Sequence, residues 1–171
     1  MTEPASLGSA PPPEPAGDDH VRGAGPEALV YLDLGCPRCA GTWAEVAFLP
    51  LRICVRHFPL AAKRPRSPAL HAATEAAALQ SEDGFWGLWD LLLADRSHVD
   101  DPHLWERIER LGLDLDRFES DRRSPAVAAR VRRDFVSGIR AGVTGTPSAF
   151  TASGPVEGDL AAALAALAEG R

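Results

Sequence analysis

The residues with the clearest chemistry are two cysteines, which lie in the motif Cys36-Pro37-Arg38-Cys39. They follow the short apolar run 28–34, which predicts a buried strand, and they precede residues 40–49, which predict a helix. Pro37 then lies at or next to the first helical position, where its missing N–H costs little. The free amides and the dipole at that helix end favour a thiolate on Cys36, and Arg38 can add a positive charge.

A thiolate on Cys36 can attack a disulfide, and the second cysteine can resolve the product. Placement at a helix start lowers a cysteine pKa from about 8.5 to somewhere between roughly 3.5 and 7.5. Cys39 lies one helical turn further in, and it can attack a mixed disulfide formed by Cys36 without large motion. We therefore predict that Cys36 is the nucleophile and Cys39 the resolving thiol. The prediction includes no cofactor and no metal ligand.

The same cysteines also fit a zinc site, because Cys36, Cys39, Cys54 and His57 have the spacing C-x2-C-x14-C-x2-H. The second pair falls on a predicted strand over residues 51–58, where residues three apart face opposite sides. The first pair begins a helix with a proline between the cysteines, whereas a zinc ribbon needs a tight turn. Zinc therefore stays an alternative, and we interpret Cys54 as a core cysteine and His57 as a structural histidine.

The chain divides into parts that would position these cysteines. Residues 1–26 are rich in Pro, Gly, Ala and acidic residues, which predicts a disordered or loosely ordered N-terminal tail. Residues 27–61 contain a strand, a helix and a strand, which indicates a parallel pair with a right-handed crossover. Residues 62–141 are predicted to be an entirely helical insertion, and residues 142–171 add a strand and a final helix to the core.

The insertion carries its own local signals. Ser67, Asp101 and Ser124 each stand before a proline, so each is predicted to cap a helix that begins at that proline. Trp86 is predicted to lie on a further helix, where it is interpreted as a packing residue of the core, and among the aromatic residues it is the first candidate for lining a substrate groove. Residues 63–66 are interpreted as a solvated linker between the second strand and the insertion.

Composition limits the classes of partner. The 171 residues carry a net charge of −6, which argues against nucleic acid and anionic membranes as general partners. Three cysteines cannot form an even disulfide framework, so the CxxC pair is more consistent with catalysis or metal binding than with a structural role. No apolar run reaches the roughly 20 residues that span a bilayer, and the N-terminus lacks the features of a secretory signal. We therefore expect a cytoplasmic protein.

Several segments together resemble the DsbA-like family of thioredoxin-fold thiol–disulfide oxidoreductases, over about residues 18 to 168. The matching segments are Asp19-His20-Val21-Arg22-Gly23, Asp33, Cys36-Pro37-Arg38-Cys39, Arg56-His57-Phe58-Pro59-Leu60, Phe85-Trp86, Leu111-Gly112-Leu113-Asp114 and Gly142-Val143-Thr144-Gly145-Thr146-Pro147. The resemblance implies an α/β protein with a thioredoxin-like fold, in which helices flank a central mixed sheet and an all-helical subdomain is inserted.

The resemblance also implies that Pro147 is a cis proline packed beside the cysteine pair. The backbone of Thr146 would then be free to pair with an extended substrate segment. We therefore count Pro37, Arg38, Thr146 and Pro147 as residues that shape the site or bind substrate. Without the cysteine motif, Pro147 would be interpreted as an ordinary turn proline.

One position departs from the family pattern. Members often carry a buried acidic residue six positions before the first cysteine, and this chain has Val30 there. A buried carboxylate would take the proton from the resolving thiol. Because Val30 cannot do this, water or another group must accept that proton. Asp33, three residues before Cys36, is interpreted as a capping or loop hydrogen-bonding residue.

The sequence thus predicts a thiol–disulfide oxidoreductase for protein or low-molecular-weight thiols, with an unidentified redox partner. Two alternatives stay open, a zinc-stabilised binding module and a redox-inert thioredoxin-fold adaptor that binds peptides beside Pro147. The direction of electron flow is not determined. The proline and basic residue between the cysteines resemble the dipeptide of oxidising members of the family. A location in the cytosol instead favours reduction or isomerisation of substrates.

Overall fold

A computed structural model of the chain describes residues 12–170, which form one mixed sheet and seven helices. The strands are His20–Arg22 (β1), Glu27–Leu32 (β2), Arg52–His57 (β3), Ser148–Thr151 (β4) and Gly154–Pro155 (β5). The helices are Pro37–Val46 (α1), Ser67–Ala78 (α2), Glu82–Ala94 (α3), Asp101–Arg110 (α4), Leu115–Asp121 (α5), Pro125–Arg140 (α6) and Leu160–Ala168 (α7). All five helices of the insertion come between β3 and β4 in the sequence.

The sheet has the strand order β1-β3-β2-β4-β5, and β2 is its central strand. Only β2 and β3 run parallel, with Val30 opposite Val55, while the other neighbouring strands are antiparallel. Every residue of β2 except Glu27 is buried, as expected for an apolar strand covered on both faces. The carboxyl end of this buried strand leads directly to the cysteine motif.

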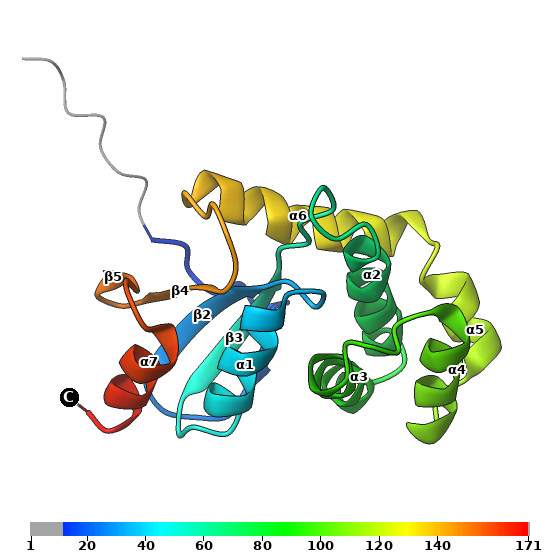
Figure 1. The fold of residues 1–171 in the computed structure, drawn as a ribbon, viewed down its shortest axis with the longest axis horizontal. Coiled ribbons are helices and arrows are strands. Elements are labelled where there is room, and N and C mark those ends of the chain that lie inside the picture. Colours follow the sequence, from blue (N-terminus) through cyan, green and yellow to red (C-terminus); the bar gives the residue numbers. More distant parts are fainter. Residues whose placement is uncertain (1–11, 171) are drawn as a thin grey trace, which may run out of the picture.

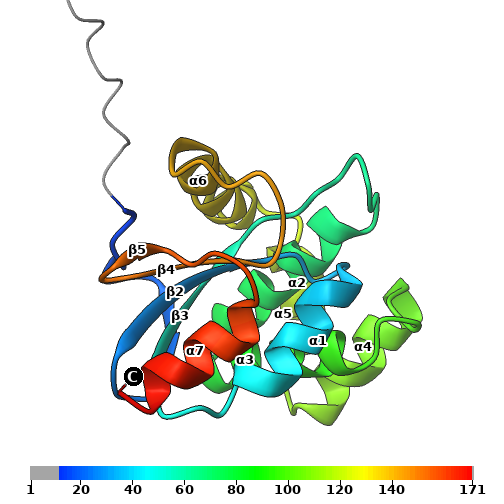
Figure 2. The ribbon, with the colours of Figure 1, turned by 60° about the vertical axis from the view of Figure 1, so that its left-hand side comes forward.

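Helices cover both faces of the sheet (Figures 1 and 2). α1 and α7 lie on one face, where residues such as Leu32, Trp43 and Leu164 form the main hydrophobic cluster. α6 crosses the other face, over a smaller cluster that contains Tyr31 and Phe58. Gly138 permits the close approach of α6, because a Cβ there would lie 2.7 Å from the Phe58 ring.

The helices α2 to α5 form a group beside the sheet, and α6 extends from this group back over the sheet (Figure 1). Leu70, Phe85 and Leu104 of these helices belong to the same hydrophobic cluster as the sheet residues that face α1. The insertion and the sheet are therefore packed into one continuous core. The predicted α/β architecture, a thioredoxin-like sheet with inserted helices, is confirmed.

Order extends into the segment where the composition predicts a tail. The prediction for residues 1–11 concerns a segment outside the described part of the chain. Within the described part, β1 pairs with β3 in antiparallel register, with His20 opposite Val55. Next to β1, the Asp19 carboxylate is fully buried and forms an ion pair of 2.7 Å with Arg56. Backbone pairing and this buried ion pair fix the chain there, and neither is visible in the local composition.

Candidate active site

Cys36 is the N-cap residue of α1, and Pro37 occupies the first helical position, as the sequence predicts. The turn between β2 and α1 is closed by the Cys36 N–H, which donates to the Asp33 carbonyl at 2.9 Å. Cys36 is 2% exposed, and Cys39 is fully buried in the first turn of α1. Both are free thiols in this structure. The strand-to-helix turn thus places two unbridged sulfurs at the positive end of a helix.

The surroundings of Cys36 stabilise its thiolate. A hydrogen bond from the Cys39 thiol is the main cause that lowers the pKa of Cys36 to about 5, against the opposing effect of burial. The Cys39 backbone N–H and the charge of Arg64 contribute to the same shift. The sulfur of Cys36 also lies 3.6 Å from the carbonyl oxygen of Thr146. Cys36 is therefore mainly ionised at neutral pH.

Cys39 has the opposite character. Burial raises the pKa of Cys39 above its usual range, and the hydrogen bond with Cys36 raises it further. Its sulfur accepts a hydrogen bond of 3.4 Å from the backbone N–H of Asp33. The two sulfurs thus differ in charge and in access, since one is an anion at the helix start and the other is a protonated, enclosed thiol.

The loop before β4 brings Thr146 and Pro147 next to Cys36, and the peptide bond between them is cis. This is the isomer that the resemblance implies. The Thr146 hydroxyl is buried and has no hydrogen-bond partner among the described residues. Segments that are far apart in the sequence, the start of α1 and the loop after α6, therefore meet at the cysteine pair.

The Asp33 side chain fixes the turn between β2 and α1 by hydrogen bonds. Its buried carboxylate accepts hydrogen bonds from the N–H groups of Gly35 (2.9 Å) and Leu60 (3.2 Å) and from the Ser67 hydroxyl. It also pairs with the Arg64 guanidinium at 3.2 Å. The loop hydrogen bonding expected for Asp33 is confirmed. The segment 63–66, interpreted from the sequence as a solvated linker, is exposed at Lys63 and Pro65, but Arg64 is partly buried because Asp33 holds it beside the cysteine turn.

Comparison with known proteins agrees with this fold. The sequence profile of the DSBA-like thioredoxin domain matches residues 41–164, which is more than half of the chain. The chain belongs to this family. The match begins at Gly41, just after Cys39, so that the cysteine pair of this DSBA-like domain lies outside the matched segment.

Solved structures of similar fold come from several bacteria. The thiol-disulfide exchange protein alpha-DsbA2 of Wolbachia pipientis has a TM-score of 0.77 at 16% identity, over 90% of this chain and 87% of that chain. A thioredoxin-like oxidoreductase of Silicibacter pomeroyi DSS-3 has a TM-score of 0.77 at 21% identity, over 90% of this chain and 92% of that chain. BdbD of Bacillus subtilis has a TM-score of 0.74 at 13% identity, over 88% of this chain and 93% of that chain. At these identities the likeness shows the fold.

Curated relatives of higher identity are longer proteins. The Na(+)/H(+) antiporter NhaA of Herminiimonas arsenicoxydans is 36% identical over 149 residues, which are 82% of this chain and 23% of that protein. The Na(+)/H(+) antiporter NhaA 3 of Salinispora tropica is 35% identical over 167 residues, 90% of this chain and 25% of that protein. The DSBA-like chain thus spans about a quarter of the length of these relatives. Its own described helices are too short or too polar to cross a bilayer.

A groove of about 290 Å³ opens beside Cys36 in the DSBA-like domain. It lies between the start of α1, the loop after β3 and the loop before β4, and its lining residues are Cys36, Arg38, Leu60, Lys63, Arg64, Thr144, Gly145, Thr146, Pro147 and Ser148. Of the residues singled out in the sequence, it brings together Cys36, Arg38, Thr146 and Pro147. Trp86, the aromatic candidate for the groove, lies elsewhere and stacks on Trp43 in the core, with the ring centroids 6.1 Å apart.

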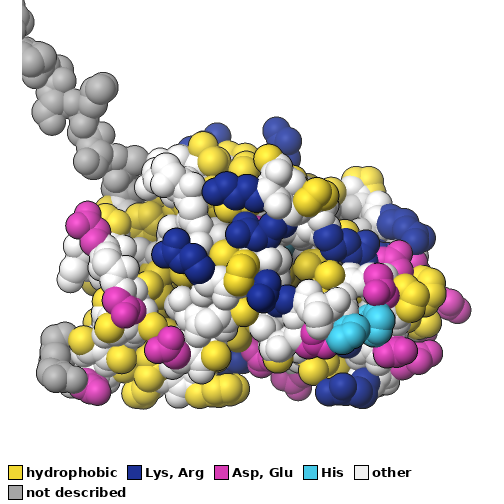
Figure 3. All heavy atoms as spheres, in the orientation of Figure 1, with side chains coloured by type: hydrophobic (Ala, Val, Ile, Leu, Met, Phe, Trp, Pro, Cys, Tyr) yellow, Lys and Arg dark blue, Asp and Glu magenta, His cyan; other side chains and the backbone are white. Residues whose placement is uncertain are grey.

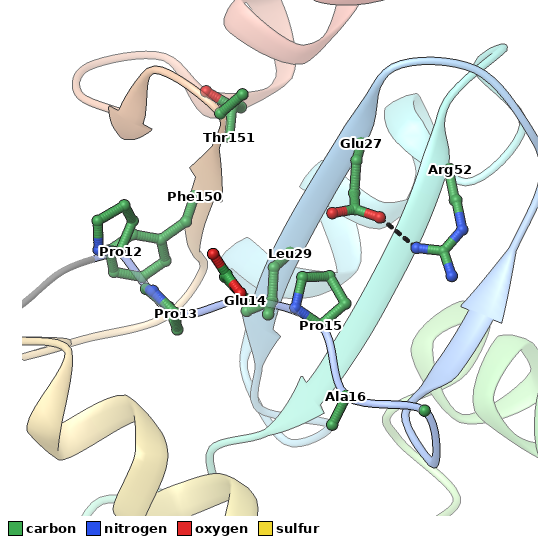
Figure 4. A pocket seen from close by; sticks show the side chains of 12 residues that line it. Pro12, Pro13, Glu14, Pro15, Ala16, Glu27, Leu29, Arg52, Phe150 and Thr151 are labelled. Atoms are coloured by element: carbon green, nitrogen blue, oxygen red, sulfur yellow. Dashed lines mark hydrogen bonds and ion pairs between the residues drawn. The ribbon is translucent and has the colours of Figure 1, made fainter.

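A larger hollow of the surface does not involve the cysteines. A cavity of about 630 Å³ lies between the segment Pro12–Gly17 and the strands β2, β3 and β4. Figure 4 shows Pro12 close to Phe150 at one side of this cavity, and the ion pair between Glu27 and Arg52 at the other. Its lining contains no thiol and no histidine. It therefore adds nothing to the chemistry at Cys36.

The zinc arrangement considered from the sequence is not formed by the described residues. Cys54 is fully buried in the smaller cluster with Tyr31, whereas Cys36 and Cys39 belong to the main cluster across the sheet. Cys54 is thus the buried core cysteine that we predicted, and burial raises its pKa. His57 faces other partners and is fixed by hydrogen bonds, as expected for a structural histidine.

Those partners form a buried chain of ionisable side chains behind the cysteine turn, which we call the histidine network: His20, His57, His71 and Glu75. His57 Nδ1 lies 2.7 Å from His71 Nδ1, and His57 Nε2 lies 2.5 Å from Glu75 Oε1. His20 Nε2 lies 2.9 Å from the same Glu75 oxygen. The other ring nitrogen of His20 lies 3.0 Å from Glu82, whose side chain is half exposed. The network therefore leads from the cysteine turn to the surface.

The donor atoms of His20, His57 and Glu75 lie within 4.8 Å of one another, close enough to surround a metal ion. The tautomers that we assign from the hydrogen-bond partners argue against a metal. The Leu34 N–H donates to His71 Nε2 at 3.1 Å, so the neutral His71 ring carries its proton on Nδ1 and donates it to His57 Nδ1. His57 must then carry its own proton on Nε2, and it donates this proton to Glu75. Because that nitrogen is occupied, we assign no metal to the cluster.

Proposed function

We propose that this DSBA-like domain exchanges disulfides with protein or low-molecular-weight thiols through Cys36 and Cys39, by way of a mixed disulfide. The observation that carries the proposal is the difference between the two sulfurs. An ionised Cys36 at the edge of a groove is suited to attack, because the thiolate is the nucleophilic form of cysteine. An enclosed Cys39 that keeps its proton is unreactive at first, and it is suited to attack only after the mixed disulfide with Cys36 has formed.

In the reducing direction, the Cys36 thiolate attacks one sulfur of a substrate disulfide and forms a mixed disulfide, and the other substrate sulfur leaves as a thiolate. Cys39 then loses its proton and attacks the Cys36 sulfur. The second substrate sulfur leaves and is protonated, and a Cys36–Cys39 disulfide is formed. Two electrons have passed from the cysteine pair to the substrate, and a dithiol partner must return them. In the oxidising direction the same steps run in reverse.

The redox behaviour of the pair tests this function directly. The domain is equilibrated with glutathione or dithiothreitol couples of graded potential, and the remaining thiols are then blocked under denaturing conditions and counted by mass. We expect Cys36 and Cys39 to disappear together as the couple becomes more oxidising, while Cys54 stays a thiol. A pair that remains reduced at every potential would instead support the redox-inert adaptor, and stoichiometric zinc in the reduced protein would support the binding module.

The ionisation of Cys36 gives a prediction about pH. The thiolate absorbance of the reduced domain should rise with a midpoint near pH 5, whereas an ordinary cysteine ionises near about pH 8.5. Above that midpoint Cys36 is charged, so the rate of attack on a neutral disulfide should be flat and should fall only as the pH drops through 5. Cys36→Ser should abolish this transition. A midpoint at the ordinary value would contradict the thiolate assignment.

The direction of electron flow and the cytoplasmic location stay predictions. The midpoint potential from the same titration bears on both, because a well-stabilised thiolate makes a dithiol pair more oxidising. A potential near that of the cytosolic glutathione pool would favour reduction of substrates. A much higher potential would favour oxidation of substrates in a compartment outside the reducing cytosol.

A further inference from the structure

We propose that the groove beside Cys36 selects substrates whose sulfur is flanked by carboxylates, either a small anionic disulfide or an acidic peptide segment. This inference rests on the proposed disulfide exchange and adds the chemical class of its substrate. Three basic side chains line the groove, Arg38, Lys63 and Arg64, and its lining includes no acidic side chain.

The sign of this charge is opposite to that of the whole chain. The protein has 24 acidic and 18 basic residues and a net charge of −6. Figure 3 shows Lys and Arg side chains grouped over the middle of the face that carries α1, with Asp and Glu side chains toward its left and right sides. A cationic region around the nucleophile in an acidic protein is therefore a local feature, and it does not follow from the average composition.

Two of the three cations are available to a ligand. Arg64 is engaged by Asp33, and its stem lies against Gly35, since a Cβ on Gly35 would be 3.0 Å from the Arg64 Cδ. The side chains of Arg38 and Lys63 are exposed and, within residues 12–170, have neither an ion pair nor a hydrogen bond. They come from different elements, the first turn of α1 and the loop after β3, and both line the groove beside Cys36, so one substrate can contact both.

This arrangement favours an anionic substrate at two stages. Opposite charges increase the rate of encounter, and the effect falls as salt screens the charges. Each exposed ion pair formed in the mixed disulfide also changes its stability by a factor of roughly two to five. Two such pairs, with Arg38 and Lys63, lead us to expect roughly ten-fold faster exchange for an acidic substrate than for its neutral counterpart.

The test compares matched disulfides that differ in charge alone. Rates of exchange with the reduced domain are measured for a peptide disulfide with Glu, Gln or Lys beside the cysteine, and for glutathione disulfide and its neutral diester. We expect acidic peptides to react faster than neutral ones and neutral ones faster than basic ones, and added salt should reduce the difference. The glutathione pair shows whether a small anion suffices or whether a peptide backbone is needed as well.

Charge reversal identifies the residues responsible. Arg38→Glu and Lys63→Glu should each reduce the preference for the acidic peptide, and the double variant should reverse it to favour the basic peptide. Arg132→Glu is the matched control, because Arg132 is an exposed cation on α6 away from the groove and its reversal should leave the order of rates unchanged. Rates are compared above the Cys36 transition of each variant, so that a shifted thiolate pKa does not imitate selectivity.

The outcomes separate this inference from the function on which it rests. Equal rates for acidic, neutral and basic peptides would overturn the selectivity and leave disulfide exchange intact. A preference that survives the Arg38→Glu/Lys63→Glu double variant would also overturn it, because the charge would then act from elsewhere. Absence of exchange with every disulfide, the neutral ones included, would remove the proposed function itself.

Discussion

Replacing Cys36 with Ser is expected to reduce disulfide exchange to the uncatalysed background, because the attacking sulfur is removed and a hydroxyl at the same helix start is not ionised at neutral pH. Cys39→Ser is expected to behave differently. The Cys36 thiolate is then still present and can form the first bond, but the resolving thiol is missing. The variant should therefore accumulate mixed disulfides with its substrates.

The expected loss of turnover in Cys39→Ser follows from the closeness of the two cysteines. Resolution by Cys39 is intramolecular, and well-oriented intramolecular reactions reach effective concentrations of about 10⁵ M or more. A millimolar external thiol cannot replace it, so turnover of Cys39→Ser should fall by several orders of magnitude.

Non-reducing electrophoresis and mass spectrometry would measure the trapped adducts, and turnover of a model disulfide would measure exchange. Cys54→Ala is the matched control, since Cys54 is buried across the sheet from the pair and its replacement should leave exchange unchanged. Adducts that formed equally well in Cys36→Ser and in Cys39→Ser would contradict the assignment of the two roles.

The part of the site that the sequence predicted is local. The N-cap position of Cys36 follows from a buried strand, a proline and a helix within a few residues of one another, and such short-range patterns determine backbone geometry. The position of Thr146 and Pro147 next to the pair came instead from family resemblance, because nothing in their own segment indicates a partner 110 residues away.

The predicted helix caps show how tertiary contacts override local signals. Ser124 caps α6 as predicted, and its side chain accepts from the Val127 N–H. Asp101 does not cap α4, because Asp100 takes that position and Asp101 pairs with Arg122. Ser67 does not cap α2 either, since its hydroxyl donates to the buried Asp33. In both misassigned helices, the predicted cap is used for a contact with a distant segment.

The histidine network could not be predicted for the same reason. Its members come from β1, β3 and α2, and two of them, His71 and Glu75, stand in an alanine-rich helix. The available signal was the presence of these polar residues in segments that otherwise predict burial, since a buried polar side chain needs a partner. That signal indicates that partners exist without identifying them, and only the fold brings the residues together.

Glu75→Ala is expected to lower the free energy of unfolding by about 3–5 kcal/mol, the cost of breaking a buried charged network by removing one partner. The Glu75 carboxylate accepts from His57 and from His20, and it is 6% exposed. Although burial opposes it, the hydrogen bonds and charges of Glu75 and Glu82 raise the pKa of His20. Without Glu75, the His57 donor loses its acceptor and His20 loses the buried carboxylate that favours its charged form.

Chemical denaturation at neutral pH would measure the loss, with Glu106→Ala on α4 as the matched control. Glu106 is exposed, and such surface substitutions usually change stability by less than about 0.5 kcal/mol. The loss of stability in Glu75→Gln should lie between those of Glu75→Ala and Glu106→Ala. The amide oxygen can still accept from His57, while the charge opposite His20 is lost. If Glu75→Ala were no more destabilising than Glu106→Ala, the network would not stabilise the fold.

The pH dependence of this loss is a further check on its cause. Burial alone would raise the pKa of Glu75, but hydrogen bonds from His20 and His57 outweigh it and hold the pKa below its usual value of 4.5. A carboxyl group with a lowered pKa stabilises the folded state above its unfolded pKa, and this contribution disappears as the pH falls through the folded value. The stability difference between wild type and Glu75→Ala should therefore shrink below about pH 4.5. Because Glu75 also raises the pKa of His20, the difference should decrease as well when the pH rises above 6.5 and His20 loses its proton. A difference that persisted unchanged in acid would mean that Glu75 acts through packing and not through its charge.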